Sequence, residues 1–148
     1  MLVPALADAF RAGLQALSDN DRAHVRVGHP RSLRGSIDLD TTLRRLCPSD
    51  ARWDYAISYQ HAGRASEFLY WVEIHPANSH GPGEVLAKLL WLRAWLRQHA
   101  SALDSIERVF VWVSSGNTSF SPNSPQVRQL ASQGLRHVGS VLCINGRR

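Results

Sequence analysis

The chain has 148 residues, of which 44% are hydrophobic and 20% charged, which predicts one globular domain, residues 1–148, rather than a disordered chain. No apolar run approaches the roughly 18 residues that cross a bilayer, and the first residues lack the basic start of a signal peptide, so we expect a cytoplasmic protein with no membrane partner. The charge of +5 and pI near 10.0 permit a nucleic-acid partner, although an excess of arginine over lysine is also typical of proteins from GC-rich genomes, including bacterial ones.

The first 50 residues are predicted to form a helix, a basic loop and a second, short helix. The first helix ends near residues 18–21 and carries apolar side chains at helical spacing, namely Leu2, Leu6, Phe10, Leu14 and Leu17. Residues 22–40 are rich in Arg and His and interrupted by Gly and Pro, which predicts a loop or a short extended piece. Arg31 and Arg34 in this loop are the expected contacts to nucleic-acid phosphates. Residues 41–46 then form a short helix before Pro48.

Residues 53–60 and 67–75 both alternate with period two, which predicts two strands joined as an antiparallel hairpin. One register gives an apolar face, because it pairs Tyr55 with Val72, Ile57 with Tyr70, and Tyr59 with Phe68. The same register places Asp54 opposite Glu73 on the other face. The sequence therefore predicts two carboxylates side by side at one end of the hairpin.

The second half of the chain continues as helix, strand, helix and strand. Residues 84–103 carry a buried stripe that predicts the longest helix, and residues 108–115 are apolar on both faces, as in a central strand. Residues 126–135 predict a short helix, and residues 136–144 a last strand. The order of elements predicts an α/β fold, with three α/β/α layers around a mixed sheet. Cys47 and Cys143 are too few and too far apart for a disulfide framework, so we interpret both as reduced.

The paired acids Asp54 and Glu73 are the candidate metal ligands. Two carboxylates this close repel each other unless something positive lies between them, and Mg²⁺ or Mn²⁺ prefers hard oxygen ligands of this kind. His75 lies two residues after Glu73, hence on the same face of the strand, where it could orient or deprotonate an attacking water. This pattern predicts a divalent-cation site with an adjacent general base.

These residues resemble the PD-(D/E)XK, or restriction-endonuclease-like, nuclease superfamily. That superfamily has a helix and a mixed sheet, an acid on one strand of a hairpin, Glu-x-Lys on the next strand, and a helix packed over the sheet. The resemblance runs from about Trp53 to Ser114, and it implies that Asp54 and Glu73 stand for the two acids of the motif. It therefore implies a restriction-endonuclease-like fold.

The chain departs from the superfamily motif at two positions. Trp53 stands where the motif has proline, and His75 stands where it has lysine. Some members carry the lysine on the following helix, and Lys88, the single lysine of the chain, lies in the second turn of that predicted helix. Asp38 or Asp40 could supply the further acid that some members add near the start of the fold.

Other interpretations of these residues remain open. Asp54 and Glu73 could lie at an exposed hairpin end and pair with arginines such as Arg52, with His75 serving as a strand-end cap. His75 and His80 could bind zinc together with Glu73, although no further His or Cys stands at a typical spacing.

Trp91 and Trp95 follow Lys88 at helical spacing. They could stack on nucleic-acid bases or pack in the core, and packing is the commoner role of tryptophans at such spacing.

The sequence favours a small nuclease that hydrolyses phosphodiesters in DNA or RNA with Mg²⁺ or Mn²⁺, using Asp54, Glu73, His75 and Lys88. The alternative is a non-catalytic scaffold with the same core that binds a protein or nucleic acid, and the replacement of the motif lysine by His75 favours it. The sequence leaves open whether the chain is a homodimer.

Overall fold

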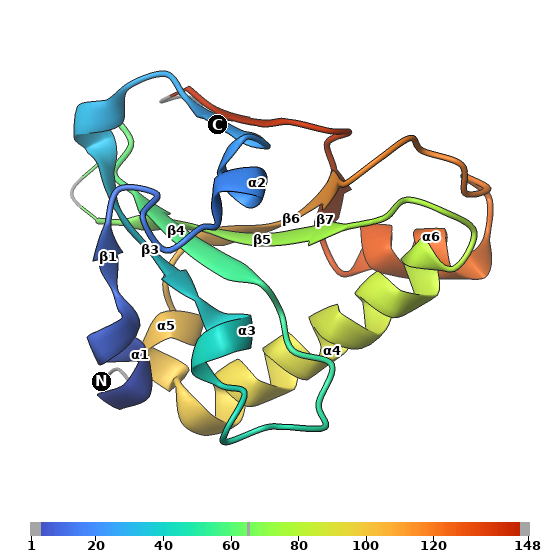
Figure 1. The fold of residues 1–148 in the computed structure, drawn as a ribbon, viewed down its shortest axis with the longest axis horizontal. Helices are drawn as coiled ribbons and strands as arrows, with labels where there is room; N and C mark the ends of the chain where they lie inside the picture. Colours follow the sequence, from blue (N-terminus) through green and yellow to red (C-terminus); the bar gives the residue numbers. More distant parts are fainter. Residues whose placement is uncertain (1–3, 65, 146–148) are drawn as a thin grey trace.

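The computed structural model describes residues 4–64 and 66–145, and its centre is a mixed six-stranded sheet (Figure 1). The strands are β1 (Arg11–Ala12), β2 (Val25–Val27), β3 (Leu33–Asp38), β4 (Tyr55–Tyr59), β5 (Phe68–His75), β6 (Arg108–Ser114), β7 (Leu135–His137) and β8 (Leu142–Ile144). The α-helices are α1 (Pro4–Ala9), α2 (Asp19–Arg22), α3 (Leu39–Thr42), α4 (Gly81–His99), α5 (Ser101–Asp104) and α6 (Pro125–Ser132). A 3₁₀ turn spans Pro30–Ser32.

The six strands lie in the order β1-β3-β4-β5-β6-β7. The pairs β1–β3, β3–β4 and β4–β5 are antiparallel, whereas the pairs β5–β6 and β6–β7 are parallel. The predicted α/β class and mixed sheet are therefore confirmed.

The predicted register of the hairpin is confirmed. Tyr55 pairs with Val72, Ile57 with Tyr70, and Tyr59 with Phe68. These residues lie in one buried cluster, whereas Ala56, Leu69 and Trp71 lie in a second cluster across the sheet. Each strand of the hairpin carries apolar side chains on both faces of the sheet. A shift of the register by one residue would therefore bring side chains of the two clusters onto the same face.

The two faces of the sheet are covered differently (Figure 1). Helix α4 crosses one face and buries Val85, Leu89 and Leu92 against it, as the helical stripe predicts. The opposite face is covered by a second sheet of β2 paired parallel with β8, and by the segment around Leu17. As far as residues 4–64 and 66–145 show, this second covering layer is built from the four-residue helix α2, the two-stranded sheet and the segment around Leu17, without a long helix.

The first predicted helix is too long, because α1 ends at Ala9 and the chain then joins the sheet as edge strand β1. Leu2 lies outside the described residues. The Phe10 ring lies directly over Gly35, where an added Cβ would also come within 2.6 Å of the Arg11 carbonyl oxygen. Gly35 thus lets the chain approach closely enough for β1 to pair with β3.

Strands β2 and β3 both lie in the segment predicted as a basic loop or a short extended piece, and β3 is a full strand of the central sheet. The buried residues of β3 include Gly35 and Ser36, which give no apolar alternation to recognise. The single predicted last strand is also wrong, because a turn at Gly139, with φ of 80°, divides it into β7 and β8 in different sheets. The predicted helix at residues 41–46 starts earlier, as α3, where the Asp38 carboxylate accepts a hydrogen bond from the Thr41 amide at 2.9 Å.

Both cysteines are free thiols, Cys47 partly buried and Cys143 exposed. None of the helices in the described ranges has the length and apolar character needed to cross a bilayer.

Candidate active site

Asp54 and Glu73 lie next to each other at the open end of the hairpin, where β4 begins and β5 ends. The Asp54 amide donates to Glu73 Oε1 at 3.1 Å, and the Ile74 amide donates to Asp54 Oδ2 at 3.0 Å. Each carboxylate therefore accepts a main-chain hydrogen bond from the strand of the other. The predicted pairing of these two acids is present, and Glu73 is completely buried rather than at an exposed hairpin end.

Lys88 reaches this acidic pair from helix α4. Its Nζ donates a hydrogen bond to Glu73 Oε2 and lies 3.8 Å from Asp54 Oδ1. The contact arises because Glu73 is on the sheet face that α4 covers, two residues from Trp71 in the same buried cluster. The structure thus brings Lys88 to the acids from the following helix.

His75 lies between two carboxylates. Its Nδ1 is 3.3 Å from Glu73 Oε2, and its Nε2 is 2.9 Å from Glu84 Oε1. The end of its strand is held by Trp112, whose indole Nε1 donates to the His75 carbonyl oxygen at 2.9 Å. The imidazole is therefore fixed from both ring nitrogens.

Sequence reasoning missed Glu84, which lies in the first turn of α4. The available signal was its spacing of four residues before Lys88, which places both side chains on one face of a helix. With α4 packed over the end of β5, that face meets both Glu73 and His75.

The pKa directions follow from this packing. Burial, and then the charge of Glu73, raise the pKa of Asp54 to about 7 despite the opposing effect of Lys88. Burial alone would lower the pKa of Lys88, but Glu73 and Asp54 outweigh it and the pKa is raised, so the amine is charged at neutral pH. The hydrogen bond to Glu73 raises the pKa of His75 against desolvation, and the bond to His75 lowers the pKa of Glu84.

The ligand types at this site suit a hard divalent cation. Asp54 Oδ1 and Glu73 Oε2 face Lys88, and neither accepts a main-chain hydrogen bond in the described residues. In proteins, Mg²⁺ is usually bound by one or two carboxylates and keeps several of its waters. Within the described ranges, no cluster of three or more His, Cys, Asp or Glu side chains has the arrangement of a metal site.

The two further acids considered from the sequence have structural partners. Asp38 caps helix α3. Asp40 pairs with Arg52 at 3.0 Å and with Arg44 at 3.7 Å. Arg52 is therefore directed to Asp40, and the described ion pairs do not join it to Asp54 or Glu73.

Arg31 and Arg34 lie away from the acidic pair. Arg34 hydrogen-bonds Gln60, which follows the other end of β4, about 20 Å along the strand from Asp54. Arg31 lies in the 3₁₀ turn before β3, at the same end as Arg34. A nucleic acid contacted by these two arginines would have to extend along the sheet to reach Glu73.

His80 occupies the position before helix α4, and the described contacts do not join it to Glu73. Trp95 is buried in the core, and Trp91 stacks on it at 6.0 Å while its Nε1 donates to Asp50 at 2.8 Å. The packing role expected for these tryptophans is thus the one present.

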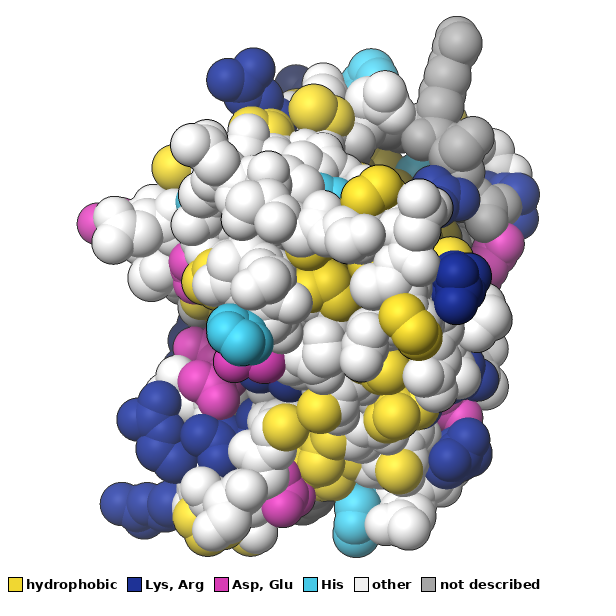
Figure 2. Space-filling view, turned by 90° about the vertical axis from the view of Figure 1, so that its right-hand side faces the viewer, with side chains coloured by type: hydrophobic (Ala, Val, Ile, Leu, Met, Phe, Trp, Pro, Cys, Tyr) yellow, Lys and Arg dark blue, Asp and Glu magenta, His cyan; other side chains and the backbone are white. Residues whose placement is uncertain are grey.

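Figure 2 shows the face of the molecule at which α4 begins. A histidine lies against acidic side chains on this face, with Lys or Arg side chains below them and an apolar area beside them. The surface is therefore mixed in charge rather than uniformly basic.

Comparisons of the chain with models of known protein families, with curated proteins and with solved structures found no match to any of them.

Proposed function

We propose that the protein is a metal-dependent phosphodiesterase that cleaves DNA or RNA, built on a restriction-endonuclease-like α/β/α core. The observation that carries the proposal is the contact between the side chains of Asp54, directly before β4, Glu73 on β5 and Lys88 on α4. Two acids and one lysine are the set that the sequence resemblance implies. The order of three antiparallel strands, a covering helix and a parallel strand supports the same interpretation.

Asp54 and Glu73 would hold the cation, Mg²⁺ or Mn²⁺. When bound, such a cation polarises the phosphoryl group and lowers the pKa of water. The raised pKa of Asp54 supports this assignment, because it reflects a buried carboxylate that still lacks enough positive charge around it. The main-chain hydrogen bonds to both carboxylates would keep their spacing fixed.

Lys88 and His75 would have different roles. Lys88 carries a raised pKa and remains charged, so it suits stabilisation of negative charge developing on the phosphoryl oxygens. His75 is the proton acceptor, because an imidazole titrates near neutral pH whereas this amine does not. Glu84 would orient the ring through Nε2.

One contact favours the alternative, a non-catalytic scaffold that binds a protein or nucleic acid. Glu73 Oε2 is contacted by both Lys88 and His75. These two groups can balance the buried charge of Glu73 without any cation, so the cluster could serve stability alone.

Cleavage assays with Glu73→Gln separate the two functions. Wild type is incubated with single- and double-stranded DNA and RNA in Mg²⁺ or Mn²⁺, beside Glu73→Gln and the matched control Glu107→Gln. Glu107 is partly exposed and directly precedes β6, at the other end of that strand from the residue that pairs with Glu73. We expect cleavage by wild type and by the control, and none by Glu73→Gln at equal folding.

Wild type that is inert on all substrates with both ions would favour the scaffold. Cation binding, measured by calorimetry on the same samples, gives a second readout. The proposal expects heat of binding in wild type and its loss in Glu73→Gln.

A further inference from the structure

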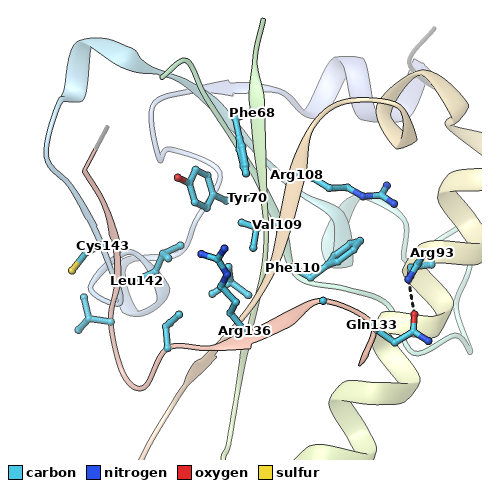
Figure 3. Close-up of a pocket in the computed structure, with 14 residues that line it drawn as sticks. Phe68, Tyr70, Arg93, Arg108, Val109, Phe110, Gln133, Arg136, Leu142 and Cys143 are labelled. Carbon is cyan, nitrogen blue, oxygen red and sulfur yellow. Dashed lines mark hydrogen bonds between the residues drawn. The ribbon is translucent and has the colours of Figure 1, made fainter. Parts of the chain in front are cut away.

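A hollow lies at the other end of the parallel strands, away from Asp54 and Glu73. Its volume is about 700 Å³, within the range of about 300–1,000 Å³ typical of small-molecule sites. It is bounded by the first halves of β5 and β6, by β7, by the start of β8, and by Arg93 and Gln133 from the helical side (Figure 3). None of the residues assigned to the candidate active site lines it.

Two arginines in this hollow have no acidic partner in the described part of the chain. Arg136, on β7, forms no ion pair there, and Arg93 bonds only the neutral amide oxygen of Gln133, at 2.5 Å. A third, Arg108, is already paired with Asp104. Figure 3 shows the Arg136 side chain extending from β7 toward Tyr70 and Val109, with Arg93 on the other side of the hollow. Among the described residues, Arg136 thus presents an uncompensated guanidinium group on the face of the sheet that carries Tyr70, whereas Arg93 lies on the face that α4 covers.

The rest of the lining is aromatic and aliphatic. Phe68, Tyr70 and Phe110 are each more than nine-tenths buried and form part of its wall. The Tyr70 hydroxyl is held by His61 Nε2 at 3.1 Å, so this ring has a fixed position. Val109 and Leu142 complete an apolar surface next to Arg136. Planar groups bind to surfaces of this composition through stacking and apolar contact.

We propose that this hollow binds a nucleoside monophosphate, with the phosphate at Arg136 and the base against the wall around Tyr70, which lies on the same face of the sheet as Arg136. Guanidinium groups match phosphate oxygens with paired hydrogen bonds, which favours a phosphate over a neutral ligand. The site is separate from the proposed catalytic one. In the register of β5 and β6, Tyr70 pairs with Val109 and Glu73 with Trp112, about 10 Å further along the strands, and the Tyr70 and Glu73 side chains lie on opposite faces of the sheet.

The test is calorimetric titration of the whole chain, without divalent cations, with AMP, GMP, CMP and UMP, and in parallel with inorganic phosphate and adenosine. We expect at least one monophosphate to bind, and to bind more tightly than phosphate or adenosine. Arg136→Ala should weaken that binding about 10- to 100-fold, as expected for loss of a charged hydrogen bond, whereas Arg93→Ala, on the helical side of the hollow, should change it little. Arg45→Ala, which removes the same charge from an exposed loop residue outside the hollow, should not weaken it.

Val141→Trp provides a variant that keeps both arginines. Val141 lies in the loop before β8 and lines the hollow, so the larger side chain should fill it and abolish binding. The proposal is overturned if no monophosphate binds, if phosphate alone binds as tightly, or if Arg136→Ala and Arg45→Ala bind equally well. Binding of oligonucleotides but of no mononucleotide would also overturn it, in favour of a groove for a nucleic-acid strand.

Discussion

Replacing Asp54 by Asn should stabilise the protein at alkaline pH. Asp54 is mostly buried beside Glu73. Burial and the charge of Glu73 disfavour ionisation of the Asp54 carboxyl group and raise its pKa from 3.8 to about 7. Asn is neutral in both the folded and unfolded states and has nearly the same shape. Its side-chain oxygen can still accept the hydrogen bond from the Ile74 amide that Asp54 Oδ2 accepts. The substitution therefore removes an unfavourable charge and keeps the Ile74 main-chain amide paired, while the Asn side-chain NH2 replaces the Oδ1 atom that lies 3.8 Å from Lys88 Nζ.

The magnitude follows from the difference between the two pKa values of Asp54. Between pH 4 and 7 the folded protein holds a proton on Asp54 that the unfolded chain releases, so the free energy of unfolding falls as pH rises through this window. A pKa moved from 3.8 to about 7 corresponds to about 4 kcal/mol once the group is ionised. Some solvent reaches the side chain, so we expect Asp54→Asn to be about 2–4 kcal/mol more stable than wild type at pH 8.5.

Urea unfolding followed by circular dichroism measures this difference at several pH values between 4 and 8.5, with EDTA present to remove divalent cations. The advantage of Asp54→Asn over wild type should grow across the window and level off above it. Asp19→Asn is the matched control, because the Asp19 side chain is 97% exposed. An Asp54→Asn protein that is less stable than wild type at pH 8.5, or whose difference from wild type does not change with pH, would refute the reasoning.

Lys88→Met should destabilise the fold by about 2–4 kcal/mol at pH 8, because it leaves the completely buried Glu73 without its lysine; urea unfolding measures the loss, which should shrink in a Glu73→Gln background. His75→Ala should lower single-turnover cleavage about 100-fold or more with little change in substrate affinity, and the wild-type rate should rise with pH as His75 loses its proton; equal rates would remove His75 from the reaction. Gly35→Ala should cost about 1–3 kcal/mol, seen as a lower Tm, because its methyl group meets the Phe10 ring and the Arg11 carbonyl; an unchanged Tm would contradict that packing.

The hairpin and α4 were predictable because their side chains repeat with a period that belongs to one structure. A slip by one residue would put Ile57 and Tyr70 on different faces, and the register that pairs them directly also brings Asp54 beside Glu73. Strand β3 was not predictable in the same way, since Gly35 and Ser36 are buried for their small size rather than for apolar character. Local pattern therefore identified the long elements whose burial depends on hydrophobicity, and it did not specify β3, which depends on close approach, or the short strands β2, β7 and β8.

The candidate site was predictable as a list of residues but not as a network. Sequence reasoning named Asp54, Glu73, His75 and Lys88, yet the contact of Lys88 with Glu73 depends on how α4 lies over β5, which no periodicity specifies. Glu84 was not predicted as a site residue, because glutamate is common in the first turn of helices, where it interacts favourably with the helix dipole. Its role as a partner of His75 becomes visible only in three dimensions.

The main-chain hydrogen bonds to the two carboxylates also make the charge of the site measurable by NMR of the backbone amides. The Asp54 and Ile74 amides each donate to a carboxylate of the site, so their NMR resonances depend directly on the charge of those groups. Protonation of a carboxylate, or its coordination to a cation, would shift these two amide signals before any distant part of the spectrum changed. Two backbone resonances would thus serve as built-in reporters of proton and cation occupancy, with no label or substrate required.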